Sequence, residues 1–320
     1  MFESKKKAVL IGTGMVGMSF AYAALNQDLC DELVLIDIDK KRAVGEAMDL
    51  NHGIAFSRSS MKIYAGDYCD CSDADVVVIC AGVNQKPGES RLDLLRRNYS
   101  VFQNIVPEVI QSGFEGIFVV ATNPVDIMTR ITYELSGFDA ERVIGTGTTL
   151  DTARLRYLLG EYFEVDPRNI HAYVIGEHGD SEFVPWSQAI LAVKPIKDVL
   201  IDNPNSYFMD ELEKIQSDVK NAAQEIIEAK KATYYGIGMA IVRVVRAVLE
   251  NENSVLTVSV RLRGEYGGKK DVFLGNPAIV NSSGVKRLLE LKLSKEEQAL
   301  LTNSYNILNV NFHSLRQHQR

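Results

Sequence analysis

The segment "GEHGDSE" contains the side chain best placed to move protons, His178, between two nearby glycines and after the apolar run "HAYVI". An imidazole changes its charge near neutral pH, so it can act as an acid or a base in a reaction. The glycines leave room for a substrate beside the ring. Because a lone histidine is more often structural, a catalytic role for His178 requires partners elsewhere in the chain.

A second segment, "TTLDTARLR", supplies a carboxylate and a guanidinium. Asp151 lies at the start of a predicted helix, and Arg154 follows three residues later on the same helical face. Asp151 can orient His178, and Arg154 can bind a substrate carboxylate through paired hydrogen bonds. An aspartate at this point is also a common helix cap, so both interpretations of Asp151 stay open.

The motif "GTGMVG" has the spacing of a dinucleotide-binding loop, because it follows the apolar run "AVLI" and opens a predicted helix. Its first glycine permits the tight turn, the second lets the backbone approach a pyrophosphate, and the third allows close packing of helix on strand. Free N–H groups at the start of that helix would hold the phosphates. The predicted cofactor-binding residues are Gly12, Gly14, Met15, Val16 and Gly17.

Asp37 stands at the end of the next apolar run, "ELVLI", twenty residues beyond Gly17. A carboxylate at this position accepts hydrogen bonds from ribose hydroxyls and repels a ribose phosphate. The sequence therefore predicts NAD, and not NADP, as the cofactor.

Six short apolar runs alternate with helical patterns through the first half of the chain, which indicates a parallel sheet covered by helices on both faces. The runs are "AVLIG", "ELVLIDID", "MKIYAG", "ADVVVICA", "GIFVVAT" and "RVIGTG". Residues 1–146 are therefore predicted to form an NAD-binding domain with a doubly wound (Rossmann) fold.

The second half has a different pattern, and residues 147–320 are predicted to form an α+β substrate-binding and catalytic domain. Apolar residues recur at helical spacing over 205–250, which predicts helix there. The runs "VLTVSVRLRG" and "KDVFLGNPAIV" predict antiparallel strands. Ser294 and Glu297 have the spacing of a capping box that opens a final helix. The expected fold class is thus α/β, with a parallel sheet plus antiparallel strands.

Composition excludes several classes of protein. The 320 residues carry a net charge of −7 and no cluster of lysine and arginine, so a nucleic-acid partner is not expected. Four cysteines form neither a disulfide framework nor a zinc-ligand pattern, which favours a reducing cytoplasmic location without a metal site. Glycines interrupt the apolar start of the chain, so we expect no targeting or membrane segment.

In these segments the chain resembles the lactate/malate dehydrogenase family, and within it the bacterial L-lactate dehydrogenases. The resemblance covers nearly the whole chain and includes "GTGMVG", "NQKPGESRLDLL", "TNPVD", "LDTARLR", "GEHGDSE" and "KKATYYGIG" in order. It implies reversible transfer of a hydride between NADH and pyruvate, with L-lactate as the product.

The resemblance also implies roles for individual residues. His178 would be the acid–base residue, with Asp151 orienting it and Arg154 binding the substrate carboxylate. Arg91, on a loop that closes over the substrate, would polarise the reacting carbonyl. The remaining implied contacts, to substrate or nicotinamide, are made by Asn123, Thr146, Thr233 and Ile237. Thr146 replaces a serine that many relatives carry.

Gln85 lies on the same closing loop and bears on the choice of substrate. Malate dehydrogenases carry an arginine at the matching position, which pairs with the second carboxylate of oxaloacetate. Neutral Gln85 would leave that carboxylate buried without a countercharge, whereas the methyl group of pyruvate fits. Pyruvate is therefore the expected substrate.

Arg156 and His171 are directed away from the predicted active site by helix and strand periodicity. Surface residues without a function would show the same pattern. The resemblance implies another role, because family members activated by fructose bisphosphate carry an arginine and a histidine at these places, paired across a subunit interface. It thus implies a homotetramer regulated by fructose bisphosphate.

Two alternatives stay open at this level. The enzyme could act on another 2-hydroxy acid, either malate or one with a larger aliphatic side chain. In a different class, the chain could be a sensor that binds NAD without turnover, although such a protein need not keep His178, Asp151, Arg91 and Arg154 together.

Overall fold

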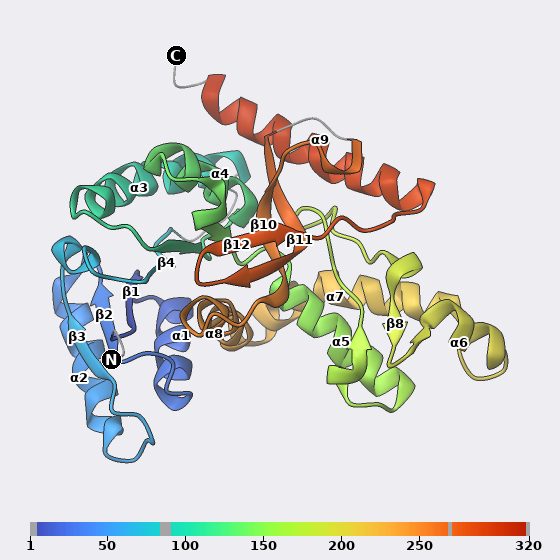
Figure 1. Ribbon diagram of the computed structural model, residues 1–320, viewed down its shortest axis with the longest axis horizontal. Helices are drawn as coiled ribbons and strands as arrows, with labels where there is room; N and C mark the ends of the chain where they lie inside the picture. Colours follow the sequence, from blue (N-terminus) through green and yellow to red (C-terminus); the bar gives the residue numbers. More distant parts are fainter. Residues whose placement is uncertain (1–4, 84–90, 268–270, 318–320) are drawn as a thin grey trace.

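The structure, a computed structural model, describes residues 5–83, 91–267 and 271–317. A nine-stranded sheet runs through the centre, with helices on both of its faces, and a smaller lobe lies at one side (Figure 1). The mixed α/β fold class predicted from the sequence is confirmed.

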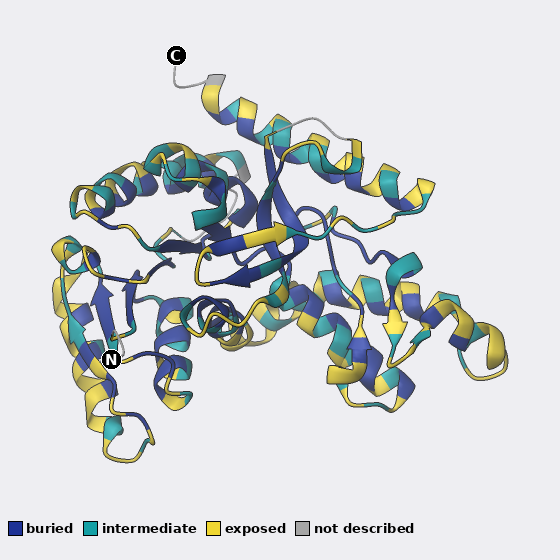
Figure 2. Cartoon of the chain, in the orientation of Figure 1, coloured by how far each residue is buried: buried dark blue, intermediate teal, exposed yellow. Residues whose placement is uncertain are grey.

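Six parallel strands form the greater part of the main sheet, as the apolar runs predicted. Their order is β3-β2-β1-β4-β5-β6, which is that of a doubly wound dinucleotide-binding fold. Nearly every residue of the inner strands is buried (Figure 2), because helices cover both faces. The strands are β1 (Lys7–Ile11), β2 (Glu32–Ile36), β3 (Lys62–Ala65), β4 (Val76–Ile79), β5 (Ile117–Val120) and β6 (Val143–Gly145).

Alternate residues of these strands enter two separate apolar cores, as the two-residue repeat of a strand requires. Leu10 and Leu33 pack in the core beneath α1, α2 and α8, whereas Val9 and Val34 pack in the core beneath α3, α4 and α9. The helices are α1 (Met15–Asn26), α2 (Lys40–Ile54), α3 (Arg91–Gln111), α4 (Val125–Ser136), α8 (Tyr235–Leu249) and α9 (Lys295–Gln317).

Three antiparallel strands continue the sheet beyond β6, and they join the two halves of the sequence. They are β10 (Ser254–Leu262), β11 (Val272–Asn281) and β12 (Gly284–Leu288). Strand β10 pairs with β6 at Ser259 and Gly145. The predicted antiparallel arrangement of this region is confirmed.

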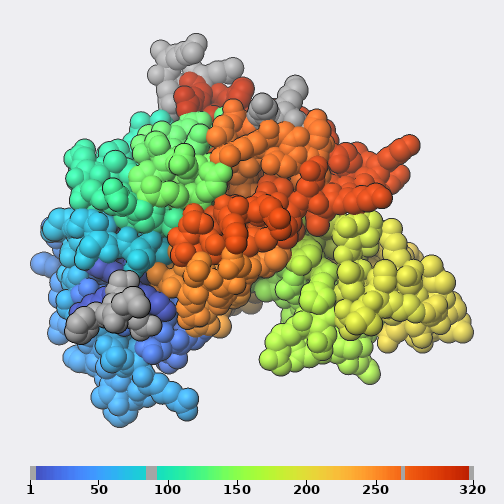
Figure 3. Space-filling view, viewed as in Figure 1, coloured from blue at the N-terminus to red at the C-terminus, as the bar shows by residue number. Residues whose placement is uncertain are grey.

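The smaller lobe has its own core, formed by residues such as Leu155, Phe163, Trp186 and Leu212. In Figure 3 its green and yellow segments project from the rest of the molecule. A three-stranded antiparallel sheet and three helices build it: β7 (Ile170–His171), β8 (Ile190–Leu191), β9 (Lys194–Pro195), α5 (Thr149–Phe163), α6 (Ile196–Asp202) and α7 (Met209–Lys230).

Two local predictions were wrong in extent. The helix expected over 205–250 is two helices, α7 and α8, because Lys231 adopts a left-handed conformation with φ of 75° and ends the first. Of the run "HAYVI" only His171 lies in a strand, β7, and beyond it the chain leaves the small sheet and continues to His178.

The capping box at the start of α9 is confirmed. The Ser294 N–H donates to the Glu297 carboxylate (2.8 Å), and the Glu297 N–H donates to the Ser294 hydroxyl (3.2 Å). Within the described ranges, none of the helices has both the length and the apolar character needed to cross a membrane.

Candidate active site

The loop between β1 and α1 has the shape that a dinucleotide pyrophosphate requires. Gly12 has φ of 101°, and a Cβ there would lie 2.5 Å from the Ala81 nitrogen. A Cβ on Gly17 would collide with the Gly12 carbonyl oxygen, so glycine is needed for α1 to approach this closely. A Cβ on Gly14 would meet no atom within 4 Å, which leaves that side open to a ligand. The residues present therefore fit a dinucleotide.

Asp37 is fixed next to this loop. Its carboxylate accepts hydrogen bonds from the Thr13 N–H (2.8 Å), the Thr13 hydroxyl (2.9 Å) and the Asp39 N–H (3.0 Å). Burial acts to raise the pKa of Asp37, but these hydrogen bonds outweigh it and the pKa is lowered. The Asp37 carboxylate is thus held ionised beside the loop.

Two further predicted cofactor-binding residues begin α1. Met15 is exposed there, whereas Val16 packs partly on the core.

His178 and Asp151 meet as the sequence suggested. The His178 Nδ1 lies 2.7 Å from Asp151 Oδ2; Asp151 is buried, and 27% of the His178 side chain is exposed. Burial alone would lower the pKa of His178, but the charge and hydrogen bond of Asp151 raise it well above its usual value. The imidazole therefore carries a proton at neutral pH while one side of it stays accessible.

Arg154 is the second neighbour of Asp151. Its Nη1 donates to Asp151 Oδ1 at 2.9 Å, one helical turn along α5, and its side chain is 14% exposed. Burial acts to raise the pKa of Asp151, but His178 and Arg154 outweigh it and the pKa is lowered. Asp151 is therefore more than a helix cap, because it connects an imidazolium with a guanidinium.

The main chain of His178 is anchored by a residue that sequence reasoning missed. Buried Asp126, in α4, accepts the His178 N–H (2.8 Å) and the Ser259 hydroxyl (2.6 Å). Burial raises the pKa of Asp126 to about 6, although these hydrogen bonds act to lower it. This carboxylate therefore links α4, in the first half of the chain, to β10 and to the loop that carries His178, residues 176–182, which we call the histidine loop. The segment "TNPVD" was the available signal, but Asp126 was not singled out in it.

The C-terminal helix also supports the histidine loop. Ser304, fully buried in α9, donates to the Ser181 carbonyl oxygen (2.8 Å), and the Ser181 hydroxyl donates to the Glu177 carboxylate (2.5 Å). Glu182, buried in the same loop, faces His178. Sequence reasoning did not single out any of these four residues.

Asn123 follows β5 and has an exposed side chain, and its carbonyl oxygen accepts a hydrogen bond from the Asn98 amide (2.8 Å). The same Asn98 side chain accepts the Val83 N–H (2.8 Å) at the base of the predicted closing loop. Asn98 therefore holds two ligand-binding segments in register, and sequence reasoning missed it.

The other predicted contacts lie on three elements. Thr146 is buried directly after β6, and Ile237 packs partly on the core from α8. Thr233 is half-buried in the connection between α7 and α8. Two further residues concern the closing loop. Gln85 lies outside the described residues, and Arg91 is the first residue of α3, with a side chain that also lies outside the description.

Arg156 and His171 lie near each other on the smaller lobe. The Arg156 Nε donates to the Ala172 carbonyl oxygen (3.1 Å), and the guanidinium lies 5.0 Å from the centre of the Tyr173 ring. Burial lowers the pKa of Arg156, and Tyr173 opposes this. His171, next to Ala172, is exposed. Arg156 thus contacts the strand segment that carries His171.

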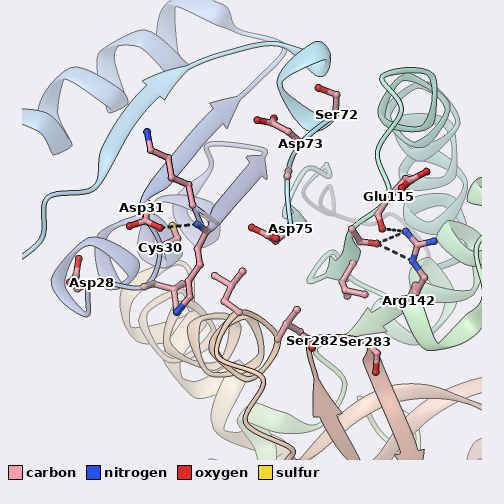
Figure 4. Close-up of a pocket in the computed structure, with 18 residues that line it drawn as sticks. Asp28, Cys30, Asp31, Ser72, Asp73, Asp75, Glu115, Arg142, Ser282 and Ser283 are labelled. Carbon is pink, nitrogen blue, oxygen red and sulfur yellow. Dashed lines mark hydrogen bonds between the residues drawn. The ribbon is translucent and has the colours of Figure 1, made fainter. Parts of the chain in front are cut away.

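A cavity of about 970 Å³ in the described part of the chain is not the candidate site (Figure 4). Asp31, Asp75 and Arg142 lie among its lining residues, at the amino ends of the parallel strands. Ligands of doubly wound sheets bind at the carboxyl ends, where the glycine loop, Asn123 and the start of α4 lie. We therefore place the active site at that edge.

At this edge a protonated imidazole with a carboxylate partner lies beside a guanidinium, and the dinucleotide-binding loop belongs to the same edge of the sheet. Such a set can bind an anionic carbonyl compound and deliver a proton to its oxygen, while a hydride comes from a bound nicotinamide. Within the described residues, the chemistry that the geometry supports is thus reduction of a small oxo acid.

Two family models match the chain. Residues 6–145 match the NAD binding domain of lactate/malate dehydrogenase, and residues 148–318 match its alpha/beta C-terminal domain.

Individual relatives agree with these matches. An L-lactate dehydrogenase 2 of Bacillus anthracis is 53% identical over 308 residues, which cover 96% of this chain and 98% of that protein. An L-lactate dehydrogenase of a Geobacillus species is 54% identical over 306 residues, 96% of this chain and 95% of that protein.

Solved structures give the same result for the fold. A lactate dehydrogenase enzyme from a Medee basin deep-sea metagenome library superposes with a TM-score of 0.95 and 52% identity, covering 98% of this chain and all of that one. The ligand-bound minor L-lactate dehydrogenase of Enterococcus mundtii gives 0.94 and 47%, with 97% and 98% covered.

Proposed function

The chain belongs to the lactate/malate dehydrogenase family and is an NAD-dependent L-lactate dehydrogenase, and from that premise we propose which residues carry out the reaction and how it is regulated. The contact that supports the proposal most directly is the hydrogen bond between His178 and Asp151, with Arg154 on the other oxygen of the same carboxylate. The interconverted substrates are pyruvate and L-lactate.

When bound, NADH supplies a hydride to the keto carbon of pyruvate. His178 gives its proton to the keto oxygen as that oxygen gains charge, so that L-lactate and NAD⁺ are the products. Asp151 stabilises the imidazolium before the transfer and fixes the ring afterwards. Arg154 binds the substrate carboxylate, and Arg91 stabilises the negative charge that develops on the oxygen.

Other residues shape the site. Asn123, Thr146 and Ile237 position the nicotinamide end, and Thr233 lines the substrate pocket. Gln85 excludes a second carboxylate, so oxaloacetate is a poor substrate. The exposed side chain of Asn123 and the half-buried side chains of Thr233 and Ile237 are compatible with these contacts.

The pH dependence of pyruvate binding follows from the charge on His178. Pyruvate accepts a hydrogen bond from the imidazolium and not from the neutral ring at the same nitrogen. Because the pKa of His178 is raised, the binding form persists through neutral pH and is lost only at alkaline pH. We therefore expect KM for pyruvate to stay constant through neutral pH and then to rise about tenfold per pH unit. A KM that rises from mildly acidic pH onward would contradict this assignment.

We further propose that fructose bisphosphate binds where Arg156 and His171 of two subunits meet. Arg156 donates to the carbonyl oxygen of Ala172, the residue that follows the exposed His171. Two such pairs facing each other would repel without an anion, so an anion that binds between them favours the assembled enzyme.

A homotetramer is part of the same proposal. Large apolar side chains are exposed on helices that pack side by side, and such surfaces mark association sites. On α1, α2 and α8 they are Met15, Tyr22, Val44, Met48, Tyr235 and Met239. We also propose that the functional boundary between cofactor and substrate halves lies near residue 146, and that the enzyme acts in the cytoplasm.

Fructose bisphosphate should lower KM for pyruvate by about tenfold and favour the tetramer, an effect of usual size for an allosteric ligand. His171→Asp should remove the response, because it places a carboxylate where the anion would bind. The activation should be stronger at mildly acidic than at alkaline pH, because a protonated imidazole attracts an anion and a neutral one does not. The test is a titration at subsaturating pyruvate, with sedimentation velocity in parallel.

His313→Asp is the matched control, because His313 is an exposed histidine on α9. It should respond to fructose bisphosphate like the wild type. A wild-type enzyme that is unresponsive and already tetrameric at low concentration would exclude the regulatory site.

A further inference from the structure

Glu182 is a second carboxylate that faces the proton-bearing nitrogen of His178. Its Oε2 lies 3.8 Å from His178 Nδ1, and only 4% of its side chain is exposed. The same nitrogen is hydrogen-bonded to Asp151 at 2.7 Å. One imidazole N–H therefore has two buried carboxylates beside it, of which only Asp151 is at hydrogen-bonding distance.

The turn of the histidine loop brings Glu182 to this position. Ile175 and Phe183 exchange two backbone hydrogen bonds, at 2.9 and 3.0 Å, so the segment between them folds back on itself. The Glu182 N–H closes the turn on the Gly179 carbonyl oxygen at 3.2 Å. The backbone of this closed segment therefore places Glu182 beside the ring of His178.

Few charges compensate Glu182. Burial raises its pKa to about 7 and Asp151 also raises it, whereas His178 and the more distant Lys220 of α7 lower it. Above neutral pH it is therefore a buried anion, and among the described residues the imidazolium of His178 is the cationic group in contact with it. Among the residues that the structure describes, the charged groups around the pair are Asp126 from α4, Asp151 and Arg154 from α5, Glu177 from the same loop, and Lys220 from α7.

We propose that Glu182 is a positioning residue for His178: its charge, added to that of Asp151, holds the imidazolium and sets the alkaline limit of pyruvate reduction. The inference rests on the proposed role of His178 as the proton donor. Asp151 orients the ring through a hydrogen bond, whereas Glu182 acts through its charge. An opposite charge within about 4–6 Å shifts a titration by about one pH unit or more.

Glu182→Gln keeps the size of the side chain and removes its charge. The pH at which KM for pyruvate begins to rise should fall by about one unit, so that KM at alkaline pH is about tenfold higher than in the wild type. At mildly acidic pH the two enzymes should agree, because His178 is protonated in both. Glu182→Asp, which keeps a charge at a greater distance, should fall between them.

A purely structural role for Glu182 would lower Tm and leave the pH profile in place, so both are measured. Glu213→Gln, an exposed position on α7, controls for the change in net charge and should leave the profile unmoved. The proposal is overturned if the pH profile of KM for pyruvate in Glu182→Gln equals that of the wild type. It is also overturned if Glu213→Gln shifts that profile by the same amount as Glu182→Gln.

The titration of the His178 ring by NMR in the NADH complex gives a readout that does not depend on turnover, with the resonance assigned by its loss in His178→Asn. Its midpoint should fall in Glu182→Gln even if pyruvate were not the substrate, so failure of this inference and failure of the proposed function are distinguishable. If Glu182→Gln does not fold, a midpoint in Glu182→Asp equal to that of the wild type overturns the proposal.

Discussion

His178→Asn should lower kcat for pyruvate reduction by about 10³-fold or more, the size typical for loss of a general acid. Asparagine cannot deliver a proton, whereas the backbone contact from residue 178 to Asp126 does not need the ring. The histidine loop should therefore stay in place, and NADH should bind with an affinity within about twofold of the wild type. Steady-state turnover and an NADH fluorescence titration measure the two quantities.

The control for this variant is His313→Asn, which changes an exposed histidine on α9 and should leave both quantities unchanged. Near-normal turnover in His178→Asn would remove His178 from the mechanism. Loss of NADH binding together with turnover would instead indicate that the substitution disturbs the fold.

Gln85→Arg should raise the ratio of kcat/KM for oxaloacetate over that for pyruvate by about 10³-fold or more. A site with a buried charge discriminates strongly against a ligand that lacks the opposite charge. The arginine supplies a countercharge for the second carboxylate of oxaloacetate. With pyruvate, the same arginine would be left without its anion. The measurement is kcat/KM for both acids in both proteins.

Gln111→Arg introduces the same charge at an exposed position at the far end of α3, and its ratio should equal that of the wild type. A ratio that does not change in Gln85→Arg would mean that another part of the closing loop selects the substrate.

The main sheet could be predicted from the sequence because its signal is local. Runs such as "VVVI" are apolar at every position, and a strand buried on both faces requires this. The ends of elements depended on single residues that periodicity does not reveal. Lys231 in a left-handed conformation divides one predicted helix into two, although apolar spacing continues on both sides.

The residues proposed to contact ligands could be singled out from the sequence more readily than the residues that hold them in place. His178, Asp151 and Arg154 lie in segments with distinctive composition. Asp126 and Ser304, in contrast, act through contacts over long separations in sequence: 52 residues from Asp126 to His178 and 123 from Ser304 to Ser181. Tertiary packing creates such pairs, so a search for local motifs does not find them.

The most direct test of the central assignment is to incubate the wild-type protein with NADH and either pyruvate or oxaloacetate, to follow NADH absorbance, and to identify the product with a stereospecific lactate assay. The account predicts one L-lactate formed for each NADH oxidised, with kcat/KM for pyruvate exceeding that for oxaloacetate by about 10³-fold or more. Equal rates with the two acids, or no oxidation of NADH by pyruvate, would contradict it.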